Sequence, residues 1–125
     1  MLEAYSLNVT VATNSVIPFN SVTLKKGCTA ELLGNGTIQL NKCGVYMVEC
    51  DASASASTTI QLFKDSVAQP QAQSTGSSLS FTTLVQVTEN NSTCPCSAPT
   101  LLQVKNTGTA SATFTDANIV ITKII

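Results

Sequence analysis

The segment Asn41–Asp51 constrains the fold of this chain more than any other, and it reads Asn-Lys-Cys-Gly-Val-Tyr-Met-Val-Glu-Cys-Asp. Side chains alternate between the two faces of a β-strand, so Val45 and Met47 fall on one face and Tyr46 and Val48 on the other. A strand that is apolar on both faces must be covered on both faces. We therefore expect this segment in the middle of a β-sandwich or at a subunit contact.

The rest of the chain has the same extended character. The run Gly34–Gly36, with Asn35 at its centre, predicts a hairpin because Asn and Gly adopt positive φ at little cost. Ala52–Ser57 alternates alanine with serine, and this period of two favours an extended segment. No segment has a helical period long enough to predict a helix. We predict an all-β sandwich of about eight to ten short strands, with the first and last strands paired in one sheet.

The length of 125 residues predicts a single domain over residues 1–125, with residues 1–6 as a short lead-in before the first strand. Two polar runs, Gln69–Ser78 and Glu89–Pro99, are expected to form loops. Such loops are natural places for contacts with a ligand. The candidate ligand-contacting residues in them are Gln69, Gln71, Gln73, Asn90 and Asn91.

Charged residues make up only 10% of the chain and the net charge is −1, against a typical charged fraction of about 25%. The lysines form no cluster, which argues against nucleic acid and anionic membranes as partners. No apolar run reaches the ~20 residues that cross a bilayer, and the first residues lack the features of a signal peptide. We expect a protein that is made in the cytoplasm and reaches an outer surface only as part of an assembly built there.

The five cysteines are an odd number, so at least one thiol stays free or pairs between chains if the others are oxidised. Without a secretion signal, reduced thiols are the default expectation. Two alternatives remain open. One is a disulfide between Cys28 and Cys43, and the other is a thiolate metal site formed by Cys28, Cys43, Cys94 and Cys96, since zinc accepts four sulfur ligands.

The chain contains no histidine, so it lacks the usual general base and the imidazole metal ligand. A serine or cysteine nucleophile would have no histidine partner. Glu49 and Asp51 share a strand face and could pair or bind calcium, but a solvated strand end is the simpler interpretation. We predict a protein without catalytic residues or a cofactor.

Several segments follow one another in an order that resembles the tumour-necrosis-factor/complement-type trimeric jelly roll. The similarity is greatest to the bacterial and phage branch of that superfamily, which includes the C-terminal domain of collagen-like spore-surface glycoproteins. The Gly-x-Tyr strand that begins at Gly44 is its most recognisable element. The ordered segments are Ile17–Asn20, Thr37–Leu40, Gly44–Val48, Ile60–Asp65, Val67–Pro70 and Ala117–Lys123.

The resemblance implies a ten-stranded jelly roll that assembles as a homotrimer. Its first, last and Tyr-bearing strands would lie near the three-fold axis. The collagen-like stalk of that family is missing, because the chain has no Gly-x-x repeat. The residues expected in the trimer interface or the core are Val9, Val11, Tyr46, Val48, Phe114, Ile119 and Ile121.

The function that the resemblance implies is structural. Short stand-alone versions of this domain are encoded among the virion genes of phages and prophages, which suggests a capsid decoration or head-fibre protein on the virion surface. Its partners would be a capsid or fibre protein and, through weak attachment, a cell-surface glycan. The alternatives are a receptor- or carbohydrate-binding fibre tip and a spore- or cell-surface structural domain.

Overall fold

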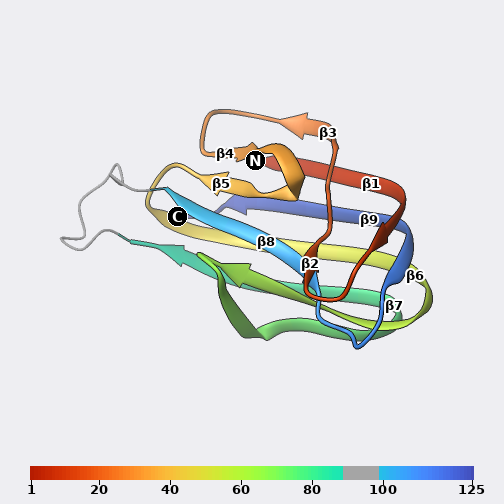
Figure 1. Cartoon of the computed structure of the whole chain (residues 1–125). Helices are drawn as coiled ribbons and strands as arrows, with labels where there is room; N and C mark the ends of the chain where they lie inside the picture. Colours follow the sequence, from red (N-terminus) through yellow and green to blue (C-terminus); the bar gives the residue numbers. More distant parts are fainter. Residues whose placement is uncertain (89–98) are drawn as a thin grey trace.

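The computed structural model describes residues 1–88 and 99–125 (Figure 1). These residues form nine β-strands and one short 3-10 helix, η1, and none of their helices is long and apolar enough to cross a membrane. The elements are β1 (Leu2–Val11), β2 (Ser15–Val16), β3 (Ser21–Lys25), β4 (Ala30–Leu32), η1 (Gly34–Gly36), β5 (Ile38–Leu40), β6 (Gly44–Lys64), β7 (Val67–Val87), β8 (Thr100–Asn106) and β9 (Ala112–Lys123).

The strands form two layers that share β6 and β7. In one layer, which we call the β1/β9 sheet, the order is β3, β1, β9, the first half of β6 and the second half of β7. In the other, the β5/β8 sheet, the order is β4, β5, β8, the second half of β6 and the first half of β7. All pairings are antiparallel, so the predicted all-β sandwich is confirmed.

Strand β6 passes from one sheet to the other without a break. Its first half pairs with β9 up to Ala54, and its second half pairs with β8 from Ile60 onward. The register with β7 shifts between Ser53 and Thr58, where β6 crosses between the layers. The intervening alanines and serines are small enough for the tight crossing, and the expectation that this segment is extended is confirmed.

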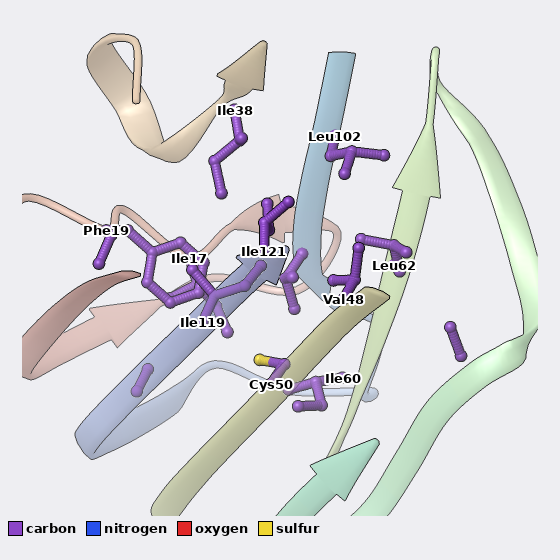
Figure 2. Close-up of a cluster of buried hydrophobic side chains, with 14 of the residues drawn as sticks. Ile17, Phe19, Ile38, Val48, Cys50, Ile60, Leu62, Leu102, Ile119 and Ile121 are labelled. Atoms are coloured by element: carbon purple, nitrogen blue, oxygen red, sulfur yellow. The ribbon is translucent and has the colours of Figure 1, made fainter. Parts of the chain in front are cut away.

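The core fills the space between the two sheets. The inward side chains of β6, Tyr46, Val48 and Cys50, are fully buried, and Ile60 and Leu62 are buried on the second half of the same strand. Figure 2 shows Val48 and Cys50 among the aliphatic side chains of the neighbouring elements. The segment Asn41–Asp51 was predicted to be covered on both faces, and the structure covers the face that carries Tyr46, Val48 and Cys50. The core residues contributed by other elements include Leu2, Ile17, Phe19, Ile38, Leu40, Leu102, Phe114, Ile119 and Ile121.

The first strand begins earlier than the sequence suggested. Residues 1–6 were expected as a lead-in, but β1 starts at Leu2, and Leu2, Ala4 and Ser6 are fully buried. The strand pairs with β9 from Leu2 opposite Ile121, which confirms that the first and last strands are partners. Buried and half-buried residues alternate from 2 to 6. The sequence shows this alternation only weakly, because the polar Ser6 occupies a buried position.

The segment Gln69–Ser78 is a strand and not the predicted loop. It lies within β7, which pairs with β6 on both sides of Gly76. Gln, Ser and Thr can occupy the solvent side of a strand, and Pro70 is tolerated because β7 has only one strand neighbour. The hairpin predicted at Gly34–Gly36 is confirmed, since β4 and β5 pair around it and Asn35 has a φ of 63°.

Candidate functional site

The outward side of the β1/β9 sheet carries the most distinctive exposed surface of the described residues. Its centre is a row across four strands, in which Glu3, Val120, Glu49 and Thr82 lie opposite one another in successive pairs. We call this surface the carboxylate face. Its residues are Leu24 on β3, Glu3, Tyr5 and Leu7 on β1, Asp116, Asn118, Val120 and Thr122 on β9, Met47, Glu49 and Asp51 on β6, and Thr82 and Leu84 on β7.

One end of the carboxylate face is apolar. Met47 on β6 lies opposite Leu84 on β7, and Leu84 is 57% exposed. Met47 is half-buried. Val120, which is half-buried, and Leu24, which is 37% exposed, lie in the central row on either side of Glu3. Large apolar side chains that gather on one side of a sheet indicate a contact surface more than isolated ones do.

The carboxylates of this face outnumber its cations. Glu3, Glu49, Asp51 and Asp116 are four of the seven acidic residues of the chain, and no lysine lies among them. Glu3 accepts hydrogen bonds from Thr23 Oγ1 at 2.7 Å and from Asn118 Nδ2 at 3.3 Å. Nothing in residues 1–88 and 99–125 forms an ion pair with Glu49 or Asp51.

Three of the six lysines form contacts away from this face. Lys25 forms an ion pair with Glu31 at 3.8 Å, and Lys64 Nζ donates to the backbone carbonyl of Gln86 at 2.7 Å. Lys105 Nζ lies 4.4 Å from the ring centroid of Phe63, on the outward side of the β5/β8 sheet. In residues 1–88 and 99–125, no carboxylate of this face forms an ion pair.

The predicted interface-or-core residues lie in the core of the protomer. Val11, Tyr46, Val48, Phe114, Ile119 and Ile121 are at most 3% exposed and point between the sheets, and Val9 packs against them from a half-buried position. Their side chains are therefore covered within one chain. The alternation in β6 identifies the outward set instead, because Met47 and Glu49 occupy the opposite face of the strand from Tyr46 and Val48.

The predicted ligand-contacting residues are only partly described. Gln71 and Gln73 are exposed on β7, and Gln69 is half-buried there. Asn90 and Asn91 lie outside the described residues. The three glutamines therefore belong to a sheet edge and do not form a binding loop.

The structure shows neither the Cys28–Cys43 disulfide nor the thiolate metal site that the sequence left open. Cys28 is a free, exposed thiol and Cys43 is disulfide-bonded, so no Cys28–Cys43 bridge forms and Cys43 is not a thiolate. Cys94 and Cys96 lie outside the described residues. The described residues contain no group of three Cys, Asp or Glu side chains that could hold a metal. The disulfide at Cys43 also corrects the expectation that the thiols are reduced.

Cys50 lies in the apolar core. It is a free thiol, fully buried between the sheets and surrounded by aliphatic side chains (Figure 2). Burial raises the pKa of the Cys50 thiol far above its ordinary value, and the neighbouring charge of Asp51 adds to the effect. Because the thiolate is the reactive form, Cys50 is inert in the folded chain.

No family model matches the sequence, and no curated protein matches it. Solved structures match the fold. The globular domain of zebrafish complement 1qA protein has a TM-score of 0.70 at 11% identity, covering 99% of this chain and 96% of that chain. Eiger TNF from S. frugiperda has a TM-score of 0.72 at 12% identity, covering 99% and 92%, and rabbit GITRL has 0.62 at 9%, covering 100% and 95%.

These matches extend over nearly the whole length of both chains. The chain has the TNF/C1q jelly-roll fold. Identities of 9–12% establish the fold alone. The resemblance implied ten strands, and the described residues contain nine, of which β6 and β7 each run through both sheets.

Proposed function

We propose that this chain is a non-enzymatic structural protein that forms a homotrimer and is displayed on the surface of a phage or prophage particle, as a capsid decoration or head-fibre protein. The TNF/C1q jelly-roll fold supports the structural role. The order of the sequence segments supports the phage placement through resemblance. The observation that carries the self-association is the apolar end of the carboxylate face, centred on Leu84 and Met47.

Three copies would cover this face by closing around a shared axis. A closed ring needs two complementary patches on each chain, and it removes both from solvent. Obligate interfaces of this kind bury more than ~2,000 Å² and are strongly apolar. Leu84, Met47 and Val120 supply the apolar contact, while the buried residues of the protomer core remain within one chain.

Substitution of Leu84 tests the homotrimer. Leu84→Asp places a charge on a 57% exposed position of the carboxylate face, so it should leave the fold intact and shift the trimer to monomers in sedimentation velocity. The matched control is Val67→Asp, at a 62% exposed position in the β6–β7 hairpin, which should leave the trimer unchanged. Wild-type protein that sediments as a monomer at micromolar concentration would overturn the assembly.

The particle placement needs a separate experiment. Particles induced from the strain that carries this gene should contain the protein, as detected by mass spectrometry of purified virions. Electron cryomicroscopy of the same particles should show three-fold density on the capsid or its fibres. Recovery of the protein only in spore coats or cell envelopes would favour the alternative of a spore- or cell-surface domain.

Carbohydrate binding is a second candidate function, favoured by the outward side of the β5/β8 sheet. Gln61 and Gln73 lie opposite each other there, and both amide nitrogens donate to backbone carbonyls of β7. The amide oxygens are thus left to accept hydrogen bonds from sugar hydroxyls, beside the ring of Phe63 under Lys105. A glycan array probed with purified protein tests this function, and an array without a signal would contradict it.

A further inference from the structure

We propose that one end of the sandwich docks on the surface of an anionic phospholipid bilayer. This surface, which we call the lysine end, carries five of the six lysines of the chain. They are Lys25, Lys26, Lys42, Lys64 and Lys123. The inference goes beyond the proposed function and does not depend on the homotrimer, because every single chain has its own lysine end.

The lysines are spread over the sequence, and the fold brings them together. The backbone nitrogen of Lys26 donates to the carbonyl of Met1 at 2.9 Å, so the β3–β4 turn lies against the start of β1. Asn41 Nδ2 donates to the carbonyl of Cys28 at 3.0 Å, which joins the same turn to the segment that contains Lys42. Figure 1 shows both chain ends on the same side of the sandwich as this turn.

The two remaining lysines reach the lysine end beside Gly44, the first residue of β6. The side chain of Lys123 lies over Gly44, because a Cβ added there would come within 3.0 Å of Lys123 Nζ. Strand β7 pairs with Gly44 next to Gln86, whose backbone carbonyl accepts a hydrogen bond from Lys64 Nζ at 2.7 Å. Since Lys42 precedes Gly44 by two residues, the five lysines form one continuous surface.

Most of this positive charge has no ionic partner. Within residues 1–88 and 99–125, only Lys25 of the five forms an ion pair, with Glu31 at 3.8 Å. Lys26 and Lys42 are exposed. Asp65 also lies at this end, and its carboxylate accepts a hydrogen bond from a backbone nitrogen of β8. The absence of a lysine cluster in the sequence argued against an anionic membrane, and the fold removes that argument.

Exposed apolar side chains lie between the lysines. Ile124 and Ile125 follow Lys123 and are 50% and 77% exposed, and Met1 is 40% exposed. Val67, in the hairpin that begins at Lys64, is 62% exposed. Apolar groups beside flexible ammonium groups fit the bilayer interface, where the apolar groups enter the acyl boundary and the ammonium groups stay among the phosphates.

The composition of the surface favours lipid over other anionic partners. The six cationic side chains are all lysines, which are depleted in protein interfaces, whereas arginine is enriched there. Single-stranded nucleic acid is held by aromatic side chains that stack on its bases, and all six aromatic residues of this chain are buried or half-buried. Anionic headgroups attract lysine as a simple point charge.

The test is cosedimentation of the full chain with lipid vesicles, with far-UV circular dichroism to verify folding. The chain should bind vesicles of phosphatidylglycerol and phosphatidylcholine in equal parts, and it should not bind vesicles of phosphatidylcholine alone. Binding in about 0.1 M sodium chloride should be lost in about 0.5 M, because salt screens the attraction. Each lysine at the surface contributes about fivefold to the affinity.

Lys42→Gln is the deciding variant, and it should weaken binding to the anionic vesicles about fivefold. The double variant Lys26→Gln, Lys42→Gln should weaken it about twentyfold. The matched control is Lys105→Gln, which removes the same charge from the β5/β8 sheet and should keep the wild-type affinity. Ile125→Ser should also weaken binding several-fold, because the apolar contact with the acyl boundary is lost.

The outcomes distinguish this inference from its alternatives. Absence of binding to the anionic vesicles in about 0.1 M salt overturns it, as does an equal loss in Lys42→Gln and Lys105→Gln. Binding to polyphosphate or DNA in solution without binding to vesicles would assign the lysine end to a soluble polyanion and overturn the membrane contact. A trimer that binds no vesicles overturns this inference and leaves the proposed function standing.

Discussion

At the scale of single residues, the backbone requires glycine at a few positions where no side chain fits. Gly36 has a φ of 77° in the β4–β5 turn, and a Cβ there would collide with the carbonyl oxygen of Ile17. The sequence predicts the turn, because Asn35 and Gly36 both tolerate positive φ. The collision could not be predicted, since Ile17 reaches the turn only through the tertiary fold.

Gly36→Ala should therefore destabilise the chain more than Gly27→Ala. Gly27 has nearly the same φ, 75°, but open space around it, so alanine there meets only the backbone penalty of about 1–2 kcal/mol. At Gly36 the collision adds to that penalty. Urea titration of both variants gives the two free energies of unfolding, and equal losses would show that the turn can move away from Ile17.

Cys50 predicts a pH dependence with a definite sign. Its pKa is raised in the folded chain by burial, so it contributes stability that is complete below the pKa of an unfolded thiol, about 8.5, and is lost as the pH rises above it. The loss is up to about 1.4 kcal/mol per pH unit. Denaturant titrations from about pH 7 to pH 10 should show this slope in a Cys28→Ser background and lose it in the Cys28→Ser, Cys50→Ala double variant.

At the scale of elements, the strands with apolar alternation were predictable and the polar strand β7 was not. Its first half contains Gln, Ser, Thr and Pro70, a composition typical of loops. What makes it a strand is the hairpin with β6, in which Lys64 and Val67 pair across Asp65 and Ser66. A two-residue hairpin sets the register of everything that follows, and the polar side chains then lie on the solvent side.

Ser66→Gly should stabilise this hairpin by up to about 1 kcal/mol. Asp65 and Ser66 both have positive φ, 48° and 68°, which costs a serine more than a glycine. Ser77→Gly, at an exposed position of the same strand without positive φ, should instead lose about 0.5–1 kcal/mol. Thermal unfolding of the two variants should shift in opposite directions, and a common direction would contradict the explanation.

At the scale of the whole molecule, the layered all-β fold followed from the sequence while the assignment of faces did not. The resemblance implied that the strand of Tyr46 lies near a three-fold axis, while its two apolar faces predicted only the middle of a sandwich or a subunit contact. In the fold, the face of β6 that carries Tyr46 is covered by the other sheet of the same chain. Tyr46 is fully buried, and its hydroxyl donates a hydrogen bond to the backbone carbonyl of Lys42. The topology decides which apolar face of the strand packs against the second sheet. The residue pattern of one strand is not enough to predict this choice.

Tyr46→Asp should consequently unfold the protomer and not merely dissociate an assembly. A buried unpaired carboxylate in place of a large aromatic costs several kcal/mol, enough to exceed the stability of many small domains. Circular dichroism should show loss of the β signal in Tyr46→Asp. A folded monomer of Tyr46→Asp would return this residue to the subunit contact.

The passage of β6 and β7 through both layers has a mechanical consequence. A load that tries to peel one layer from the other is carried at the crossing by covalent backbone, in addition to the interleaved side chains. Neither sheet stays intact when it loses β6 and β7. We therefore expect no partly unfolded intermediate in which one sheet remains folded. When the chain is stretched, it should therefore yield abruptly in a single step.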